Sequence, residues 1–495
     1  MDPVSATTFL FVSCVVCLIF SWARKRSKCG PGKLPPGPPG LPFLGNMLQL
    51  NSKKMFTSLI QLSEKYGPVY TIHLGPDPVV VLCSYDAVKE ALNDKGEEFS
   101  ARGNMPLLER VNRGHGVISS NGERWKQLRR FSLMTLRNFG MGKRSIEERI
   151  QEEAQFLVEE LKKTERLPFD ATFFFSRAVS NVICSIIFGN RFEYEDRNFL
   201  YLMNLMNDTF RLFSSSWGQL YNFFPNIMEY VPGLHHRLFK DVQQLQDFAR
   251  EKVKIHQETL DPNSPRDFID CFLIKMNEEK GNSASEFNMD ALVVTTFDMF
   301  SAGTETVSTT LRYGLMALLK NPDVEDKVHE EIDRVIGRNR CPAINDRSSM
   351  PYTEAVIHEI QRFADIIPMG LPHTVTKDIQ FRKYVIPKGT TVFPMLSAVL
   401  HDPKQFKSAH TFTPENFLDG NGAFKRNDAF MPFSAGRRIC LGEGLARMEL
   451  FLFLTTILQN FKLKPAGDPK DLDLTPEISG FGNFPRPYEL CLLPR

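Results

Sequence analysis

FSAGRRICLGEG, at residues 433–444, is the stretch that decides the fold. Three of its residues are glycines, which let a backbone approach a bulky partner closely. Cys440 stands among them, just before an apolar stretch at residues 442–460 that we expect to be a buried helix. A cysteine beside a helix N-terminus, with Arg437 and Arg438 nearby, is placed to ionise to a thiolate.

Metal ligation is the chemistry that suits this cysteine. Cys440 has no His or Cys neighbour at the spacing of a structural zinc site. Its thiolate suits a metal whose other ligands come from a macrocycle, such as haem. Residues 433–442 match the F-x-x-G-x-R-x-C-x-G haem-thiolate loop of the cytochrome P450 superfamily at every fixed position, and the whole chain resembles a microsomal family-2 member. The resemblance implies haem b as cofactor, with Cys440 as the axial iron ligand and Gly442 in the cofactor-binding loop.

A second motif is Glu359-Ile360-Gln361-Arg362, the E-x-x-R of the same superfamily. Residues three apart share a helix face, so Glu359 and Arg362 can pair, and most such pairs are solvated surface pairs. The resemblance implies instead a buried structural pair behind the haem. Relatives often add an Arg from a P-E-R-F segment, but residues 414–417 read PENF, so Asn416 puts that third partner in doubt.

A third motif lies in a long apolar stretch, where residues 302–306 read AGTET. Hydroxyls inside a helix usually bond back to a carbonyl one turn earlier, which is a purely structural interpretation. The resemblance implies the oxygen-activation segment, in which the helix opens locally and Thr306 and Glu305 are catalytic residues that relay protons. Val307 stands where relatives often carry Thr or Ser, so we expect the relay to be tuned, not lost.

Further site residues follow from the resemblance alone. Those implied to bind the haem propionates are Arg102, Trp125, Arg129, His373 and Arg438. Those implied to line the substrate pocket are Ile118, Ser119, Phe297, Ala302, Leu371 and Phe481. Trp125 and Arg129 are four residues apart and share a helix face, which makes that pair physically sensible. A lone His such as His373 is more often a structural residue.

The N-terminal region has the pattern of a membrane anchor. Residues 4–23 are free of charge and long enough to cross a bilayer, and the basic sequence RKRSK follows at residues 24–28. A cleaved signal peptide fits poorly because no Lys or Arg precedes the apolar run. We therefore expect a single transmembrane helix with the body of the chain in the cytosol, and the resemblance implies the endoplasmic reticulum membrane.

The domain organisation that we expect has three parts. Residues 1–28 form the anchor with its basic stop, residues 29–45 form a hinge rich in Pro and Gly, and residues 46–495 form a single haem-thiolate catalytic domain. Nothing after the hinge resembles another linker, because no long Ser/Gly tract, charge block or fixed repeat occurs.

The body of the chain is expected to be mainly α with small β-sheets (α+β), the cytochrome P450 fold. Helical spacing predicts helices at residues 145–164, 289–320, 324–336, 352–364 and 442–460. Strand patterns predict a hairpin from residues 69–74 and 79–83, and one further β cluster from residues 379–381, 384–386 and 390–394.

Composition and charge limit the partners. With 60 Lys+Arg against 58 Asp+Glu, the net charge of +2 gives no reason to expect nucleic acid. Nine irregularly spaced cysteines do not make a disulfide scaffold. Near Trp125 stands a basic set, usually no more than a solvated face: Arg124, Lys126, Arg130, Arg137, Lys143 and Arg144. The resemblance implies that this face receives the acidic NADPH–cytochrome P450 reductase, with cytochrome b5 as a second candidate partner.

The function implied is a monooxygenase acting on a small apolar substrate, by hydroxylation or epoxidation. Xenobiotics, steroids and fatty acids all remain candidate substrates, since a few pocket substitutions switch among them. Three alternatives stay open: a haem-thiolate isomerase or peroxide-using enzyme, a haem-binding sensor, and an anchored scaffold without haem.

Overall fold

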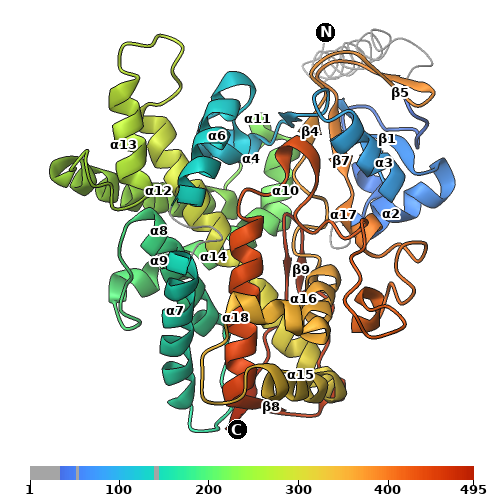
Figure 1. Ribbon diagram of the computed structural model, residues 1–495. Helices are drawn as coiled ribbons and strands as arrows, with labels where there is room; N and C mark the ends of the chain where they lie inside the picture. Colours follow the sequence, from blue (N-terminus) through green and yellow to red (C-terminus); the bar gives the residue numbers. More distant parts are fainter. Residues whose placement is uncertain (1–33, 52–54, 139–143) are drawn as a thin grey trace, which may run out of the picture. The chain divides into compact units, whose positions relative to one another are not determined.

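The computed structural model describes residues 34–51, 55–138 and 144–495 (Figure 1). These residues pack as two compact units: the described residues up to Asn104 with Met369–Met395, and those of Met105–Pro368 with Leu396–Arg495. The predicted anchor and its basic stop lie outside the described residues. Within the described ranges, no helix combines the length and the apolar character that crossing a bilayer requires. The predicted division into anchor, hinge and single catalytic domain stays a prediction.

The first unit is built on a five-stranded sheet. Its elements are η1 (Met47–Gln49), α2 (Met55–Tyr66), β1 (Val69–Leu74), β2 (Asp77–Leu82), α3 (Tyr85–Lys89), η2 (Glu90–Asp94), β3 (Ala101–Arg102), β4 (His373–Thr374), β5 (Ile379–Phe381), β6 (Tyr384–Ile386) and β7 (Thr391–Pro394). The strand order is β1-β2-β7-β4-β3, and β2 pairs with β7 in parallel. The run PVVVL in β2 is nearly all apolar, as a central strand buried on both faces requires.

The sheet corrects one prediction. The hairpin of β1 and β2 is confirmed, with Val69 opposite Leu82 and Leu74 opposite Asp77. The three later strands do not form one cluster: β5 and β6 make a separate two-stranded sheet, whereas β7 joins the large sheet. A parallel partner so distant in sequence leaves no local pattern, because no turn connects the two strands.

The described part of the predicted hinge lies against β1. The Thr71 N–H donates to the carbonyl of Pro36 (2.9 Å), and a Cβ on Gly37 would lie only 1.7 Å from the Thr71 carbonyl oxygen. Asn46 exchanges bonds with His73, donating its N–H to the His73 carbonyl and accepting the His73 N–H at its side-chain oxygen, both at 2.7 Å. The Pro/Gly composition therefore lets this segment approach a strand closely.

The second unit is mainly helical. Its helices are α4 (Pro106–Asn112), α5 (Gly116–Ser119), α6 (Gly122–Asn138), α7 (Arg144–Lys162), α8 (Thr172–Ile187), α9 (Arg197–Ser214), α10 (Ser216–Phe223), α11 (Pro225–Met228), α12 (Leu234–Thr259), α13 (Phe268–Glu278), α14 (Met289–Lys320), α15 (Pro322–Val335), α16 (Pro351–Ala364), α17 (Leu396–Leu400) and α18 (Glu443–Asn460). Shorter elements are η3 (Ile344–Ser349), η4 (Pro414–Phe417), η5 (Gly436–Arg438), η6 (Pro469–Asp471), β8 (Phe461–Pro465), β9 (Ile478–Ser479), β10 (Asn483–Phe484) and β11 (Leu490–Pro494). Two antiparallel pairs, β8 with β11 and β9 with β10, complete the unit.

Helix α14 organises the core of the second unit. It contacts α8, α5, α12, α16 and α18, and most of its 32 residues are buried (Figure 1). Asn288 caps its start, accepting the N–H of Ala291, and Pro322 stops its extension. Gly303 lets α8 approach, because a Cβ there would lie 2.6 Å from Cδ1 of Ile183. The predicted span of this helix, residues 289–320, is confirmed.

Candidate functional site

The cysteine loop sits in the second unit and is shaped by two residues in the left-handed region. Ser434 and Gly436 have φ of 62° and 70°, and they turn the chain into the short helix η5, which begins at Gly436. The Cys440 N–H then donates to the Phe433 carbonyl at 2.9 Å, which closes the loop. Helix α18 begins three residues later, at Glu443. The loop thus presents Cys440 beside a helix N-terminus, as the sequence indicates.

Desolvation dominates the electrostatics of Cys440. Burial raises the pKa of its thiol, although the N–H groups of Gly442 and Glu443 and the charge of Arg129 lower it. The side chain nevertheless remains accessible, so it opens onto a space among protein atoms. Arg129, which the resemblance assigns to the haem propionates, therefore also acts on Cys440. A bound metal ion would favour loss of the thiol proton here.

Cys440 differs from the other described cysteines. Cys184 and Cys491 are buried, and burial raises the pKa of the Cys184 thiol strongly. Cys341 is exposed like Cys440, but it lies on the surface after α15 and accepts a hydrogen bond from Gln155. Cys440 therefore combines an accessible side chain with a place just before the first turn of a helix.

Three of the predicted propionate residues come together beside the loop. The guanidinium carbon of Arg438 lies 3.8 Å from the centroid of a Trp125 ring, and that of Arg129 lies 5.9 Å from a Trp125 ring centroid. Arg438 Nη2 donates to the Ser120 carbonyl (2.8 Å), and Arg129 Nη2 donates to the Ile439 carbonyl (2.7 Å). Trp125 is 7% exposed. Its buried indole N–H has no hydrogen-bond partner among the described residues.

The other two predicted propionate residues belong to the first unit. Arg102 on β3 stands opposite His373 on β4 in the antiparallel register. Both side chains are buried. His373 Nδ1 lies 2.6 Å from the Phe99 carbonyl, and Arg102 Nη1 donates to the carbonyl of Leu371, a predicted substrate residue, at 3.3 Å. The five predicted residues thus form two groups, one in each unit.

The E-x-x-R motif is a buried ion pair. Glu359 and Arg362 lie on α16 with fully buried side chains, joined by two bonds of 2.7 Å. Arg362 also donates to the Leu400 and Ala409 carbonyls. Asn416 donates to both Glu359 oxygens at 3.3 Å. An amide therefore stands in the third place, where relatives often have a guanidinium, and it reaches the same carboxylate.

The AGTET segment lies in the middle of α14, which is continuous there. Thr306 Oγ1 donates to the Ala302 carbonyl at 2.7 Å, the backbone bond that the structural interpretation predicts. Ala302 and Thr306, one turn apart, are half-buried on a helix whose neighbouring residues are mostly buried. Glu305 is buried, and burial raises its pKa to about 7. The segment thus pairs a partly accessible hydroxyl with a carboxyl that titrates near neutrality.

Two predicted substrate residues are held in place by a residue that sequence reasoning missed. Ile118 and Ser119 lie on α5, and the Ile118 N–H donates to Asp298 Oδ2 on α14 at 3.1 Å. Asn112 Nδ2 donates to Asp298 Oδ1 (3.2 Å). A Cβ on Gly116 would lie 2.3 Å from Asp298 Oδ2, so only glycine allows this approach. Asp298 therefore anchors α5 to α14.

Asp298 could be suspected from its sequence context. It is an acidic residue inside a long apolar helix, next to the buried Phe297 that the resemblance places in the pocket. Burial raises its pKa to about 7, opposed by the backbone N–H groups of Ile118 and Val117. A buried carboxyl of this kind needs partners, but the sequence does not say which ones.

Phe481 packs against α9. It lies between β9 and β10, and its ring centroid is 5.8 Å from that of Phe213 and 6.4 Å from that of Phe210. Its neighbour Gly482 donates its N–H to Ser214 Oγ at 2.9 Å. The predicted pocket residues of the second unit are thus tied to α5, α14 and α9.

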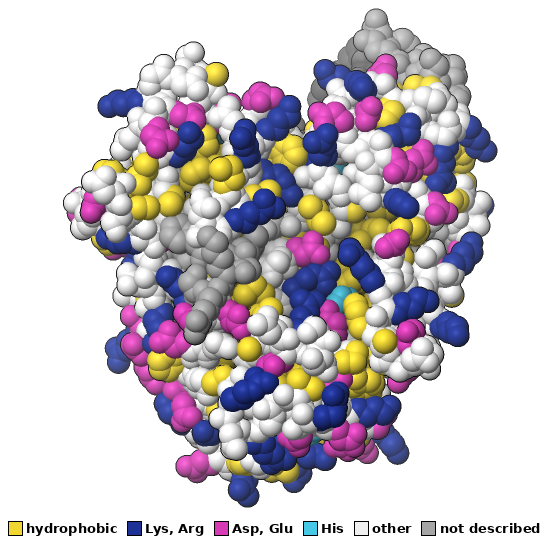
Figure 2. Space-filling view, in the orientation of Figure 1, with side chains coloured by type: hydrophobic (Ala, Val, Ile, Leu, Met, Phe, Trp, Pro, Cys, Tyr) yellow, Lys and Arg dark blue, Asp and Glu magenta, His cyan; other side chains and the backbone are white. Residues whose placement is uncertain are grey.

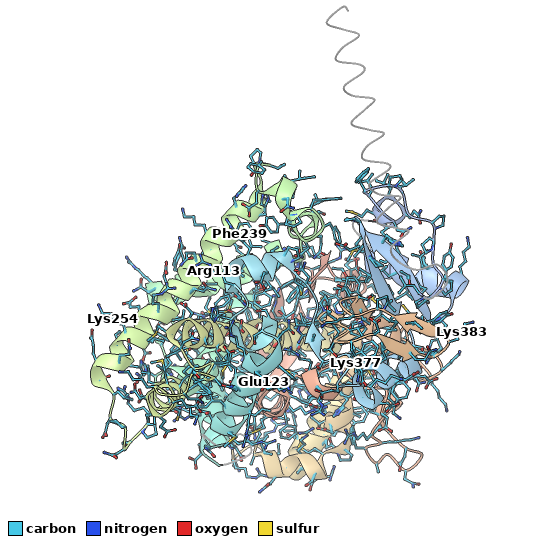
Figure 3. The ribbon with its side chains drawn as sticks, turned by 90° about the horizontal axis from the view of Figure 1, so that it is seen from above. Arg113, Glu123, Phe239, Lys254, Lys377 and Lys383 are labelled. Atoms are coloured by element: carbon cyan, nitrogen blue, oxygen red, sulfur yellow. The ribbon has the colours of Figure 1, made fainter. Side chains whose placement is uncertain are left out.

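An outer cavity of about 430 Å³ lies between α4, α12 and α14. Figure 3 shows Arg113, at the end of α4, beside Phe239 of α12, and both line this cavity. Its wall includes Asn112, which also bonds to Asp298.

The predicted basic face is partly neutralised. Arg124 pairs with Glu286 at 2.7 Å, and Lys126 pairs with Glu123 at 2.8 Å. Arg130 and Arg137 are exposed on α6. Lys143 lies outside the described residues, as does the side chain of Arg144. Figure 2 shows basic and acidic side chains interspersed on the face that it presents.

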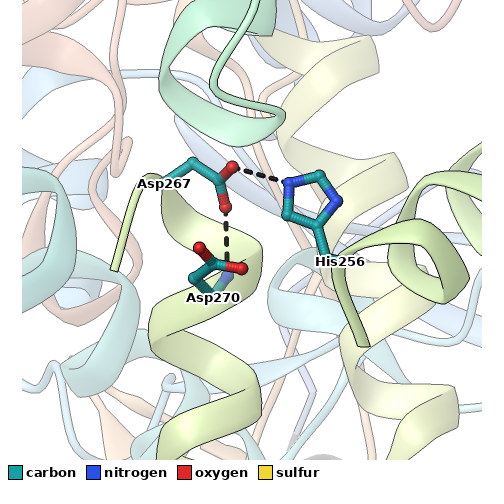
Figure 4. Close-up of side chains that lie close together, drawn as sticks. All are labelled: His256, Asp267 and Asp270. Carbon is teal, nitrogen blue, oxygen red and sulfur yellow. Dashed lines mark hydrogen bonds and ion pairs between the residues drawn. The ribbon is translucent and has the colours of Figure 1, made fainter. Parts of the chain in front are cut away.

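A buried His–Asp–Asp cluster joins α12 to α13 (Figure 4). His256 Nε2 lies 2.6 Å from Asp267, whose other oxygen accepts the N–H of Asp270. Asp270 in turn binds Arg266 through two bonds of 2.7 and 3.0 Å. The spacing of the three side chains suits a metal ion. Their contacts are nevertheless those of a helix cap, in which Asp267 caps α13 and His256 binds Asp267.

Known proteins are similar in sequence to this chain over its whole length. The sequence model described as Cytochrome P450 matches residues 35–492. Cytochrome P450 2F3 of Capra hircus is 57% identical over 495 residues, and cytochrome P450 2G1 of Oryctolagus cuniculus is 55% identical over 495 residues, each match covering 100% of both chains. Cytochrome P450 2C11 of Rattus norvegicus is 59% identical over 494 residues, which cover 100% of this chain and 98% of that protein.

The chain belongs to the cytochrome P450 family. The expected fold, mainly helical with small sheets, is thereby confirmed. Membership of this family implies a haem-thiolate oxidoreductase of the monooxygenase type. The residues of the second unit fit a haem group. An accessible cysteine lies there together with two guanidinium groups and with an indole N–H that has no partner among the described residues.

Proposed function

We propose that this cytochrome P450 inserts one oxygen atom of O2 into a small apolar substrate, with electrons from NADPH–cytochrome P450 reductase. The observation that carries the proposal is the Cys440 loop, in which an accessible thiol lies at a helix start and the N–H groups of Gly442 and Glu443 lower its pKa against burial. The candidate substrates are xenobiotics, steroids and fatty acids, which hydroxylation or epoxidation would modify.

In the proposed site, Cys440 is the axial ligand of haem b and Gly442 belongs to the supporting loop. Haem bound there supplies the oxygen-activating iron, which no side chain can replace. Trp125 offers its buried indole N–H to a propionate, and Arg129 and Arg438 offer guanidinium groups. Arg102 and His373 contribute in the same way from the first unit. Glu359 and Arg362 fix the core that carries the loop.

Proton delivery is assigned to Glu305 and Thr306. Glu305 can give up and regain a proton near neutral pH, because burial brings its pKa to about 7. Thr306 is bonded to the Ala302 carbonyl through its own hydrogen, so its oxygen stays available to accept a bond. A carboxyl that titrates in this range, next to a half-buried hydroxyl, is suited to pass protons inward.

The substrate is held by apolar contacts. The six residues that we assign to its pocket wall are Ile118, Ser119, Phe297, Ala302, Leu371 and Phe481. Ser119 donates to the His115 carbonyl at 3.0 Å, so its hydroxyl is engaged within the wall. Such a lining discriminates weakly between similar substrates, by about 1–3 kcal/mol for one methylene.

The test is reconstitution in lipid vesicles with the reductase and NADPH. We expect NADPH oxidation coupled to oxygenated product across a panel of steroids, fatty acids and aromatic xenobiotics. A haem-thiolate isomerase or a peroxide-using enzyme would form product without NADPH. A haem-binding sensor would form none under either condition.

We assign the reductase to the surface of α6, where Arg130 and Arg137 are exposed. A charged docking surface gives an association rate that falls with salt. Reductase-driven turnover should therefore decrease between low and high ionic strength, whereas turnover driven by organic peroxide should not. A flat response of the reductase-driven rate argues against this surface. Cytochrome b5, as a second electron donor, would compete for it.

A membrane location is proposed on the uncharged run at residues 4–23 and the basic residues that follow it. We place the protein in the endoplasmic reticulum membrane as a single-pass protein with its catalytic part in the cytosol. Alkaline extraction of microsomes should leave it in the pellet, and protease added outside should digest it. Release by alkali would exclude a spanning anchor.

A further inference from the structure

Glu305 is held by a residue of a second helix. The side-chain amide of Asn207, on α9, donates to Glu305 Oε2 at 3.4 Å. The other carboxyl oxygen, Oε1, is buried and has no hydrogen-bond partner among the described residues. Asn207 is half-buried, while Met206 and Thr209 beside it are buried. The amide is thus placed where α9 meets α14, and it contacts one side of the carboxyl.

We propose that Asn207 is a positioning residue for Glu305: its amide holds the carboxyl toward α9 and stabilises the carboxylate that remains after Glu305 has delivered its proton. This inference rests on the proposed function, since it concerns the carboxyl assigned to proton delivery. It goes beyond that function by naming the residue that sets the carboxyl's orientation and charge. When Glu305 gives up its proton, the carboxylate gains from the amide bond, and it regains a proton from solvent to complete the cycle.

The charges around Glu305 support this role. On α14 itself, Arg312 lies two turns further on and favours the carboxylate. On α9, Arg211 acts in the same sense, although it is paired with Glu477 at 2.6 Å. Burial opposes both and has the largest effect. Burial outweighs both cations and brings the pKa of Glu305 to about 7, so one hydrogen bond is enough to shift its charge near neutral pH.

The experiment is a pH titration of the holoenzyme by infrared difference spectroscopy. The carbonyl band of protonated Glu305 is identified by its loss in Glu305→Gln. In Asn207→Leu, we expect the midpoint of this band to rise by about one pH unit, because the carboxylate loses a donor. Asn207→Asp should raise it further, because a second carboxylate repels the first. The matched control is Asn204→Leu on the same helix, whose amide bonds to the Leu200 carbonyl instead.

A second readout connects the carboxyl to turnover. The ratio of product formed to NADPH consumed is measured against pH with 7-ethoxycoumarin, a neutral aromatic ether. Glu305→Gln should abolish the part of this pH profile that depends on the Glu305 carboxyl. The midpoint of that part should shift to higher pH in Asn207→Leu and stay unchanged in Asn204→Leu. A purely structural role for Asn207 would lower stability without moving either midpoint.

The two proposals fail in different ways. If Asn207→Leu leaves both midpoints at the wild-type value, the inference about Asn207 is wrong while the enzyme remains a monooxygenase. If the wild-type protein forms no product with NADPH and reductase across the panel, the proposed function is wrong. The infrared midpoint then still decides whether Asn207 holds Glu305.

Discussion

Arg438 and Trp125, 313 residues apart in the sequence, lie face to face, with the guanidinium carbon 3.8 Å from a ring centroid. The cation is fixed over the ring by bonds from Arg438 to the Ser120 carbonyl and to Asn121. This stacking orients the indole, whose buried N–H has no hydrogen-bond partner among the described residues. An oriented donor of this kind is what a buried anionic group requires.

Trp125→Phe should weaken haem retention without unfolding the protein. The ring remains to stack with Arg438, and only the N–H donor is lost. A hydrogen bond to a charged group, about 1.5–3 kcal/mol, corresponds to a roughly 10- to 150-fold faster transfer of haem to an acceptor protein. Haem transfer is followed by absorbance, with Trp217→Phe as control because Trp217 stacks on His235 instead. Equal haem-transfer rates in the two variants would contradict the assignment of Trp125 to the cofactor site.

Asn416→Ala should destabilise the fold. Asn416 supplies two bonds to Glu359, which otherwise pairs with Arg362 and accepts the Thr413 N–H. Loss of these donors to a buried carboxylate should cost about 1–3 kcal/mol of unfolding free energy in urea. Glu359→Gln should cost more, about 3–5 kcal/mol, because it leaves Arg362 buried without a counter-charge. Asn421→Ala, on an exposed turn, is the control. An unchanged free energy of unfolding in Asn416→Ala would show that the amide does not contribute to stability.

The helix spans were largely predictable, and the pairing of strands was not. Residues 289–320 carry an unbroken helical pattern ended by Asn-Pro, so α14 could be predicted to the residue. The register of β7 with β2 could not, because a parallel pair separated by about three hundred residues has no local signal.

The candidate site shows the same contrast. Cys440, Glu359 and Arg362 stand in short motifs with fixed spacing, so the sequence identifies them. Asp298 and Asn207 act through partners on other helices, and a single sequence does not show which side chains meet. Cys440 illustrates this limit, since the charge of Arg129, more than three hundred residues earlier in the sequence, acts on its thiol.

Asp298→Ala should loosen the substrate wall. The Ile118 N–H and the Asn112 amide lose their acceptor, and α5 is no longer tied to α14. We expect the dissociation constants of panel compounds to rise roughly tenfold, about 1.4 kcal/mol, in substrate-difference spectra. Asp290→Ala, an exposed acid in the first turn of the same helix, is the control. Unchanged constants in Asp298→Ala would mean that α5 keeps its position without the carboxyl.

His256→Gln should make the stability less dependent on pH. Burial disfavours the charged imidazole, but the bond and charge of Asp267 outweigh it and raise the pKa of His256 above 6.5. A raised pKa stabilises the folded state below pH 6.5, and this contribution disappears as the pH rises through the folded value. In urea unfolding, the free energy of unfolding of the variant should be lower than that of the wild type by about 1–3 kcal/mol at about pH 6 and by less at about pH 9. The exposed His236→Gln is the control, and an equal loss at both pH values would contradict the assignment.

The central claim is that Cys440 binds haem iron as a thiolate. The most direct test is the ferrous–carbon monoxide spectrum of the purified protein, because thiolate ligation shifts the Soret band to the red. We predict the shifted band in the wild-type protein and in Cys184→Ala, whose cysteine is buried in α8, and its loss in Cys440→Ala. Absence of the band in the wild-type protein, or its survival in Cys440→Ala, would contradict the account.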